Sequence, residues 1–313
     1  MSAPRVSVYL LCRDRLDYFR EAIESILGQS YLDFELIVSD NSEGDEVGHY
    51  VASTYPNLKY LRRRPPLGPI DHLTRILDEV ESEYLVMFHD DDVLLPEYLN
   101  RMVCTLDAYP NTAAVGCNAF IIFGSKHSKA LFAPGLCASV TIQTPEELFS
   151  HYVNLKDICH APFPCYLYRM SIVRGVHPNE EEGGKHADVS FLMNVLKAGQ
   201  IRWIPDVLMQ YRRHAGNGSN EENIEEQLSL LRFALLNTKL TKKDIVIDDF
   251  RFVFWARWLL PKLDLVAYFC SRRIRIVTKF VLSRALSMLI IRPKVLGAKM
   301  ARKLAVRLHI KWV

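Results

Sequence analysis

The sequence predicts an α/β fold with a mostly parallel central sheet and helices on both of its faces. Two observations carry this prediction. Apolar runs typical of buried strands alternate with segments of helical periodicity over residues 5–109. The apolar run at residues 84–88 is followed by Asp90, Asp91 and Asp92, and polar side chains after a buried strand are typical of the ligand-binding edge of a parallel sheet.

The first 89 residues indicate an alternation of strands and helices. Apolar residues from Leu16 to Leu27 recur at helical spacing, and Gly28 is placed to end this helix. A strand, a helix and a second strand in succession form a βαβ unit, which predicts parallel pairing. The predicted elements are strands at residues 5–11, 34–39 and 57–61, a helix at about 70–81, and the central strand at 84–89.

Further elements are predicted beyond Pro96. Thr144 to Glu147 resemble a helix start, with a proline in the first turn and acids near the positive end of the helix dipole. Residues 177–186 are polar and contain glycine, so we expect a flexible loop over the site. The other predicted elements are helices at 97–109, from 187 onward and around 228–235, strands at 113–124 and 163–168, a loop at 125–140, and a pair of strands at 201–204 and 207–211.

Composition bounds the class of protein. The chain has 313 residues and enough apolar content for a large core. Its seven cysteines are scattered and include no C-x-x-C pair, which indicates reduced thiols and neither a disulfide framework nor a zinc site. The start of the chain lacks a signal-peptide pattern, so a cytoplasmic protein is expected.

Charge is distributed unevenly along the chain. Residues 251–313 hold 15 Lys and Arg but one acid, Asp264, which leaves 24 basic and 35 acidic residues in 1–250. Residues 251–313 therefore carry a net charge of +14 and residues 1–250 a net charge of −11. Opposite net charges suggest that the two regions have different functions. We expect a catalytic domain over residues 1–225 and a helical, basic region over 226–313.

The basic C-terminal region has no apolar run long enough to span a bilayer. Ile274, Val277 and Val281 share one helical face, while Arg272, Arg275 and Lys279 share another. This pattern favours a helix at a membrane interface, drawn to anionic lipid, and hence a peripheral protein of the cytoplasmic membrane. The alternative is a helical subdomain packed on the catalytic domain or on a second subunit. Nucleic acid is not an expected partner, because the larger part of the chain is acidic and no such module is present.

The three consecutive carboxylates are the candidate metal site. Asp90, Asp91 and Asp92 repel one another, so their burial requires a cation or strong hydrogen-bond donors. Mg²⁺ or Mn²⁺ is the simplest answer, since these ions take oxygen ligands and keep positions open for water and phosphate. The alternative is a solvated acidic turn before the helix that Pro96 begins. The place at the carboxyl end of a buried strand favours the metal.

Two further polar turns are candidates for binding a nucleotide. Asp40 ends the strand at 34–39 and can accept a hydrogen bond from a nucleobase or a ribose hydroxyl, although such a turn is often only a turn. The run from Arg62 to Arg64 precedes a turn with Gly68, and arginine suits a diphosphate. In isolation the same run would be a solvated face.

Taken together, these motifs resemble family 2 glycosyltransferases. The resemblance covers about residues 5–220 and rests on the order and spacing of short motifs. It implies a GT-A fold and a nucleotide-sugar donor, with a UDP-sugar as the first candidate. It also implies transfer with inversion to a hydroxyl of a glycan or lipid-linked acceptor. The motifs are Val6 to Val8, Ala22 to Tyr31, Phe34 to Ser42, Gly68, His89 to Asp92, Pro164 to Arg169, Asp188, and Tyr211 to His214.

The resemblance also implies roles for single residues. The metal, Mn²⁺ or Mg²⁺, is assigned to Asp91, Asp92 and His214, and His89 stands where the family's D-x-D motif has its first Asp. Asp188 corresponds to the general base, which an alcohol needs before it can attack; alone, it would be a helix-capping residue. Ala187 replaces the Glu that often precedes this base. The implied donor-binding residues are Leu11, Cys12, Arg13, Asp14, Asp40, Gly68 and Asp90.

These residues favour three function classes to different degrees. A metal-dependent inverting glycosyltransferase of polysaccharide biosynthesis, associated with the membrane, accounts for most of them. A catalytically inactive sugar-nucleotide-binding protein is the alternative, because His89 and Ala187 replace acids of the family pattern. A dinucleotide-dependent oxidoreductase is disfavoured, because Cys12 to Arg15 follow the first strand where a G-x-G-x-x-G motif would stand.

Overall fold

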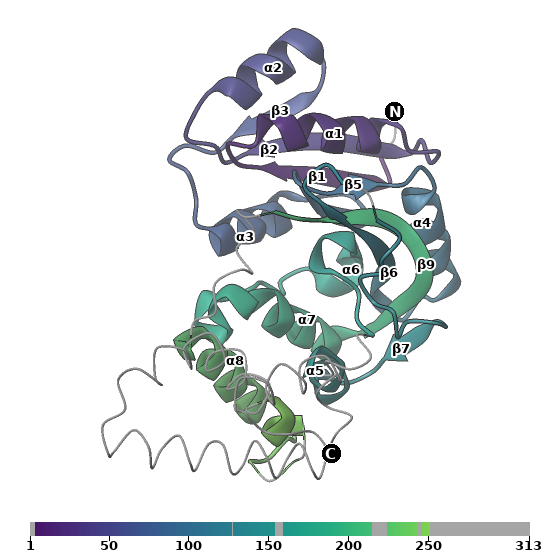
Figure 1. Ribbon diagram of the computed structural model, residues 1–313, viewed down its shortest axis with the longest axis vertical. Helices are drawn as coiled ribbons and strands as arrows, with labels where there is room; N and C mark the ends of the chain where they lie inside the picture. Colours follow the sequence, from purple (N-terminus) through teal and green to yellow (C-terminus); the bar gives the residue numbers. More distant parts are fainter. Residues whose placement is uncertain are drawn as a thin grey trace, which may run out of the picture.

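The computed structural model describes residues 4–126, 128–153, 159–214, 224–242, 244 and 246–250. These residues form a nine-stranded sheet covered by helices (Figure 1). The strand order is β3-β2-β1-β4-β8-β6-β9-β5, and β7 pairs with β9. The predicted α/β class is confirmed, but four of the eight strand pairs are antiparallel, so the sheet is mixed.

The N-terminal strands form the parallel part of the sheet. Cys12 pairs with Asp40, and Leu11 pairs with His89. The strands that carry these residues therefore end at one edge of the sheet, which places the loop after β1 between the Asp40 turn and the carboxylate run. The strands are β1 (Val6–Cys12), β2 (Phe34–Asp40), β3 (Lys59–Arg62) and β4 (Tyr84–His89).

The helices between these strands follow from apolar spacing. In α1 (Leu16–Leu27) the buried residues Phe19, Ala22, Ile23 and Ile26 lie on one face, and the Gly28 N–H ends the helix by donating to the Glu24 carbonyl, 2.9 Å away. Pro69 opens α3 (Pro69–Glu79), where a missing N–H costs nothing. The helix α2 (Glu46–Thr54) was not predicted, because it buries only Val47 and Val51 and contains Gly48.

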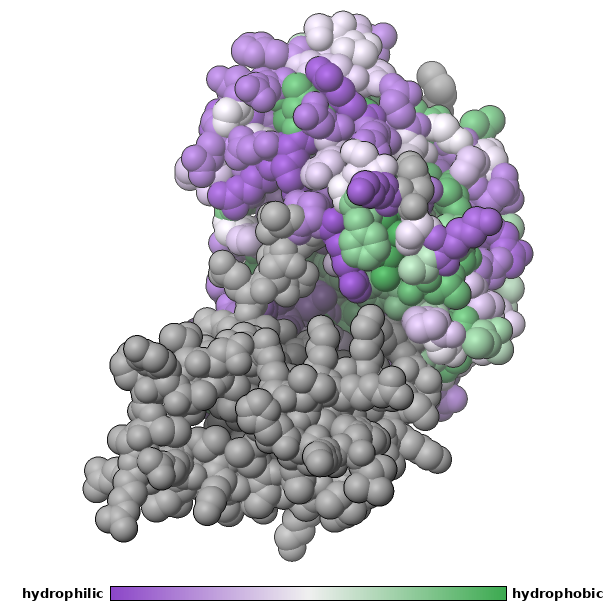
Figure 2. All heavy atoms as spheres, in the orientation of Figure 1, coloured by the Kyte–Doolittle hydropathy of each residue, from purple (hydrophilic) through white to green (hydrophobic). Residues whose placement is uncertain are grey.

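The edge of the sheet at β3 is protected by polar side chains. Lys59 on this strand is exposed, and few strongly hydrophobic side chains cover the surface around α2 and β3 at the top of the molecule (Figure 2). Charged residues on an edge strand oppose pairing with the strand of another chain.

The second half of the sheet turns antiparallel. β8 (Leu167–Arg169) lies between β4 and β6 (Thr112–Phe123) and is antiparallel to both. β9 (Gln200–Arg213) runs parallel to β6, and β5 (Val93–Leu94) and β7 (Val140–Ile142) pair with it in antiparallel fashion.

Two strand predictions in this half need correction. The expected pair at 201–204 and 207–211 is the single strand β9, whose register against β6 shifts near Pro205, where no N–H is available for pairing. Residues Phe163–Cys165 form a 3₁₀ turn, η1, and only Leu167–Arg169 are a strand. Pairing with β6 on both sides of Pro205 joins the first pair into one strand, and the prolines at 162 and 164 favour the 3₁₀ turn in the second segment.

The remaining helices complete the fold. Helices α5, α7 and α8 pack together at the end of the molecule opposite α2 and β3 (Figure 1). The polar segment 177–186 forms two 3₁₀ turns, η2 (Glu180–Glu182) and η3 (Gly184–His186), and its expected flexibility stays a prediction. The helices are α4 (Tyr98–Ala108), α5 (Pro145–Val153), α6 (Met170–Val173), α7 (Ala187–Ala198) and α8 (Ile224–Asn237).

The C-terminal boundary stays a prediction. α8 begins near residue 226, and its residues Leu230, Phe233 and Ala234 are buried in the core that the sheet and α7 share. Residues 251–313, with the basic amphipathic pattern, lie outside the described residues. Within the described part, no helix combines the length and the apolarity needed to cross a bilayer.

Candidate active site

The three carboxylates occupy the turn between β4 and β5. β4 is buried along its length up to His89, and the Asp90 N–H donates to the Leu11 carbonyl at 3.0 Å, which continues the β1 pairing by one residue. Asp90, Asp91 and Asp92 are 0, 6 and 1 % exposed. The acidic run is therefore not a solvated turn, and its charge must be compensated inside the protein.

Asp90 is held by the loop after β1. Its Oδ2 accepts the Arg13 N–H at 2.9 Å, and its Oδ1 forms an ion pair with Arg15 Nη2 at 2.5 Å. Burial raises the pKa of Asp90 to about 7, although Arg15 and the Arg13 N–H act in the opposite direction.

Asp91 has cationic partners on one oxygen. Its Oδ2 lies 2.7 Å from Arg15 Nη1 and 3.0 Å from His214 Nε2. Burial favours the protonated form, but His89, Arg15 and the hydrogen bond to His214 outweigh it and hold the pKa of Asp91 below its usual value. Asp91 is therefore ionised at neutral pH.

Asp92 has one carboxylate oxygen with a hydrogen-bond partner and one without. Its Oδ1 accepts the Arg212 N–H at 2.8 Å. Its Oδ2 is buried and has no hydrogen-bond partner among the described residues. Burial and the negative charge of Asp91 raise the pKa of Asp92 well above its usual value. A buried carboxylate oxygen without a hydrogen-bond partner is suited to bind a cation.

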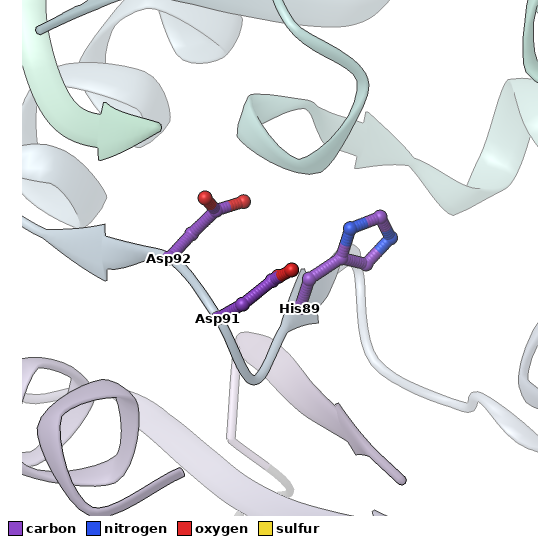
Figure 3. A group of neighbouring side chains, drawn as sticks. All are labelled: His89, Asp91 and Asp92. Atoms are coloured by element: carbon purple, nitrogen blue, oxygen red, sulfur yellow. The ribbon is translucent and has the colours of Figure 1, made fainter. Parts of the chain in front are cut away.

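The residues present fit a divalent cation. His89, Asp91 and Asp92 offer ligand atoms that all lie within 4.8 Å of one another. Figure 3 shows the three side chains at the end of β4 and on the turn after it, pointing to the same side of the chain. Burial lowers the pKa of His89, so its imidazole is neutral and has a lone pair to donate. His214, the predicted histidine ligand, contacts Asp91 at the same cluster, so the structure brings two histidines to it.

The loop after β1 lies beside the Asp40 turn. Asp14 has a left-handed backbone (φ 53°), and its carboxylate accepts the N–H groups of Glu43 and Gly44 at 3.0 and 3.1 Å. The Asn41 N–H donates to the Cys12 carbonyl at 2.9 Å. The predicted donor-binding residues of β1 and β2 are thus adjacent. Cys12 is buried, which raises the pKa of its thiol, and Leu11 is half-buried.

Asp40 is fully buried and already paired. Its Oδ1 accepts the Ser42 N–H at 2.9 Å, and its Oδ2 contacts the Tyr60 hydroxyl and Arg62 Nη1. Burial would raise the pKa of Asp40, but the hydrogen bonds from Ser42, Tyr60 and Arg62 lower it overall. A nucleoside that bonds to this carboxylate would share it with these partners.

The arginine run does not form one diphosphate clamp. Arg63 is buried and forms an ion pair with Glu79 at 2.7 Å, while Arg64 pairs with Asp45 at 2.9 Å. Gly68 caps the start of α3 in an extended conformation, and a Cβ there would lie 3.2 Å from Asp71 Oδ2. Gly68 is therefore adjacent to the Asp40 side of the site through Asn41, whose side chain bonds to Leu67 at 2.7 and 3.0 Å.

Asp188 lies in the first turn of α7 and is half-buried. His186, not Asp188, occupies the cap position. Burial raises the pKa of Asp188 to about 6. Burial raises the pKa of the Tyr211 phenol to about 12, and the negative charges of Asp92, Asp91 and Asp188 act in the same direction.

Sequence reasoning did not assign Arg15, and it grouped Arg212 with Arg213 as arginines that could neutralise phosphate; the structure places Arg15 and Arg212 at the carboxylate turn. Arg15 bridges Asp90 and Asp91, and the signal was its place in the loop that faces the carboxylate run. Arg212 is 1 % exposed; its Nε donates to the Asp91 carbonyl at 2.6 Å, and its Nη2 pairs with Glu21 at 2.7 Å. Its neighbour Arg213 is exposed, so only the structure separates the two.

The fold and the buried carboxylate turn define the class of protein. TarS of S. aureus is similar with a TM-score of 0.60 at 16% identity, over 80% of this chain and 72% of that chain. The mannosyltransferase PcManGT from Pyrobaculum calidifontis, solved with GDP-Man and Mn²⁺, is similar with a TM-score of 0.55 at 17% identity, over 98% and 87%. These likenesses confirm the predicted GT-A fold.

Sequence comparison then identifies the family. Residues 7–174 match the family model for Glycosyl transferase family 2, more than half of the chain, and the chain belongs to that family.

Curated relatives are distant. An uncharacterized glycosyltransferase of Haemophilus influenzae is 23% identical over 259 residues, 79% of this chain and 77% of that protein. One of Rickettsia felis is 21% identical over 258 residues, 81% of this chain, and the match spans only 42% of that protein. A Campylobacter jejuni protein, GalNAc(5)-diNAcBac-PP-undecaprenol beta-1,3-glucosyltransferase, is 30% identical over 104 residues, 32% of this chain and 34% of that protein.

Proposed function

We propose that this member of family 2 is a metal-dependent, inverting glycosyltransferase that transfers a sugar from a nucleotide-sugar to a hydroxyl of a glycan or lipid-linked acceptor. The observation that carries the proposal is a chain of ring contacts from the carboxylate turn to α7, which holds Asp188 in its first turn: the Phe163 ring lies 6.2 Å from that of His89 and 6.4 Å from that of Phe191 on α7. A leaving-group site and a general base must face one reacting bond, and this arrangement supports that geometry.

The donor is proposed to bind over the carboxyl ends of β1, β2 and β4. Structures of TarS were solved with UDP-GlcNAc and with UDP, and that of PcManGT with GDP-Man. They support a nucleotide-sugar donor, and we propose a UDP-sugar. The segment from Leu11 to Asp14, which spans the end of β1 and the start of the loop after it, would receive the nucleoside together with Asp40 and Gly68, and Asp90 would face the ribose.

Asp188 is proposed to accept the proton of the acceptor hydroxyl. With a pKa of about 6 it is ionised at pH 7, yet basic enough to hold a proton as the new bond forms. Attack from its side, opposite the diphosphate, inverts the anomeric centre. Mn²⁺ or Mg²⁺, held by Asp91 and Asp92 with His214 or His89, would stabilise the negative charge that develops on the leaving diphosphate.

The acceptor is proposed to be a carbohydrate because a chain of ring contacts leads from Tyr211 through Phe132, His160 and Tyr152 to His186, two residues before Asp188. The rings of Phe132 and Tyr211 lie 5.0 Å apart, and those of Phe132 and His160 lie 5.7 Å apart. Aromatic faces suit the apolar faces of sugar rings. The name of the Campylobacter jejuni relative gives that protein a lipid-diphosphate-linked glycan, which supports an acceptor of this kind.

Binding of nucleotide-sugars with Mn²⁺, followed by thermal unfolding, tests the proposal. A true donor raises the unfolding temperature of the folded state by mass action. We expect one UDP-sugar to do so in a metal-dependent manner, and a suitable acceptor then to release UDP. Binding without UDP release, with every acceptor offered, would support the inactive sugar-nucleotide-binding protein instead.

A further inference from the structure

The guanidinium of Arg15 lies against the groups proposed to hold the metal. Its Nη1 is 2.7 Å from Asp91 Oδ2 and 3.4 Å from His214 Nε2, and these two atoms are 3.0 Å from each other. A divalent cation bound to the same oxygen and imidazole would meet the guanidinium there. Arg15 and the cation would therefore compete for one pair of groups.

Arg15 reaches the cluster from the surface of the protein. It precedes α1 at the cap position, and its side chain is 34% exposed, whereas that of Asp90 is 0% exposed. When Arg15 leaves, Asp90 Oδ2 keeps its hydrogen bond from the Arg13 N–H.

The other arginine at the cluster is committed elsewhere. Arg212 directs its guanidinium to the backbone carbonyl of Asp91, to the Gly124 carbonyl and to Glu21. The Arg212 guanidinium also lies over the Tyr18 ring, 4.6 Å from the ring centroid. Arg15 is thus the arginine whose charge bears directly on the side chains of Asp90 and Asp91.

We propose that Arg15 is a resident counter-ion that competes with the divalent cation for Asp91, so that the metal binds weakly until a nucleotide diphosphate draws the guanidinium away. The inference rests on the proposed function, since it assumes a metal and a diphosphate at this site. A diphosphate offers a guanidinium paired oxygens and so replaces the carboxylates as its partner. Nucleotide binding thereby frees Asp91 for the cation, and part of the coupling between the two ligands passes through Arg15.

Mn²⁺ binding to the full chain without nucleotide tests the inference, because it needs no turnover. Free Mn²⁺ is measured by electron paramagnetic resonance. We expect Arg15→Ala and Arg15→Gln to bind Mn²⁺ at least about tenfold more tightly than the unchanged protein, because a competing positive charge is gone. Arg15→Lys, which keeps the charge, should stay within about threefold. Saturating UDP should reduce the difference between Arg15→Gln and the unchanged protein to less than about threefold.

Arg20→Ala is the matched control. It removes one positive charge from α1, the helix that Arg15 precedes, but Arg20 is exposed and lies over the Tyr50 ring at 4.8 Å. It should leave Mn²⁺ affinity within about twofold. If Arg15→Ala fails to fold, the comparison of Arg15→Gln with Arg15→Lys carries the test.

Equal or weaker Mn²⁺ binding by Arg15→Gln would overturn the inference and leave the proposed metal dependence intact. Absence of Mn²⁺ binding in every variant and in the unchanged protein, with and without UDP, would overturn both.

Discussion

At the scale of the residue, Asp188 carries the proposed chemistry, and its removal is the sharpest test. Asp188→Asn keeps the size of the side chain and the oxygen that accepts the Val189 N–H at 2.9 Å. It cannot accept a proton, so we expect kcat to fall by about 10²–10⁴-fold. Donor affinity should change by less than about threefold, because the base faces the acceptor. UDP release and donor-induced thermal shifts measure the two quantities.

Asp206→Asn is the control for this change. Asp206 pairs with Arg101 at 2.9 Å on the outer surface of the molecule, and the arginine is 53% exposed. Its loss should alter the rate by less than about twofold, since exposed ion pairs contribute little. A rate for Asp188→Asn close to that of the unchanged protein would show that another group takes the proton.

The pH dependence of the rate is a second prediction for Asp188. Burial raises its pKa to about 6, so protonation begins at a higher pH than for an ordinary aspartate. Only the ionised form accepts a proton, and kcat/KM should therefore fall about tenfold per pH unit below about pH 6 and level off above it. Rates measured from about pH 5 to about pH 8 test this. A fall centred near pH 4 would contradict the assignment, because an unperturbed carboxylate titrates there.

The residue scale also shows where sequence reasoning ends. The carboxylate run was recognisable because three acids follow an apolar strand, and Asp188 because it opens a helix at the expected place. The contact of Arg15 with Asp90 and Asp91 was not, since it depends on the register between β1 and β4 and on a side-chain rotamer. The burial of Arg212 beside an exposed Arg213 depends likewise on which face of β9 each residue occupies.

At the scale of the element, the turn from β4 to β5 is predicted to depend on a divalent cation. EDTA should abolish turnover, and Mn²⁺ or Mg²⁺ should restore it, because the leaving diphosphate otherwise lacks a Lewis acid. Asp92→Asn tests the turn itself. Burial raises the pKa of Asp92 well above its usual value and so disfavours the charged form, and a neutral amide there should cost less than about 1 kcal/mol of unfolding free energy.

The same change should weaken Mn²⁺ binding by at least about tenfold, because an amide is a poorer ligand than a carboxylate. Urea unfolding and Mn²⁺ titration measure the two effects separately. Asp91→Asn is the comparison: it removes the ionised partner of Arg15 and His214, so it should lower stability as well as metal affinity. Full turnover in EDTA would remove the metal from the mechanism.

Elements with strong apolar periodicity could be predicted from the sequence, and weak ones could not. The strands β1, β2 and β4 and the helices α1, α3 and α4 follow from runs of buried residues. α2 buries two residues, and β5 and β7 are two and three residues long, so their patterns carry little information. The joining of residues 200–213 into one strand results from pairing with β6, which is a long-range effect.

At the scale of the whole molecule, the two charged regions have different predicted roles. Residues 1–250 carry −11 and contain the site, while residues 251–313 carry +14 and lie outside the described residues. A site for a nucleotide-sugar needs local positive charge, which Arg15 supplies inside an otherwise acidic region. The basic region is therefore not needed to explain donor binding, and a membrane role for it remains a separate prediction.

We predict that the basic region attracts the full chain to anionic lipid. Each Lys or Arg near such a surface contributes about 1 kcal/mol, so replacing Arg272, Arg273, Arg275 and Lys279 with Gln should lower partitioning onto phosphatidylserine-containing vesicles by at least about tenfold. Four Gln replacements in the acidic region, at Arg20, Arg75, Lys129 and Lys239, give the same change in net charge and should have little effect. Added salt should release the unchanged protein, because it screens surface charge. Unchanged partitioning of the first variant would favour a subdomain that packs on protein, and donor-induced thermal shifts equal in both variants would show that the donor site is intact.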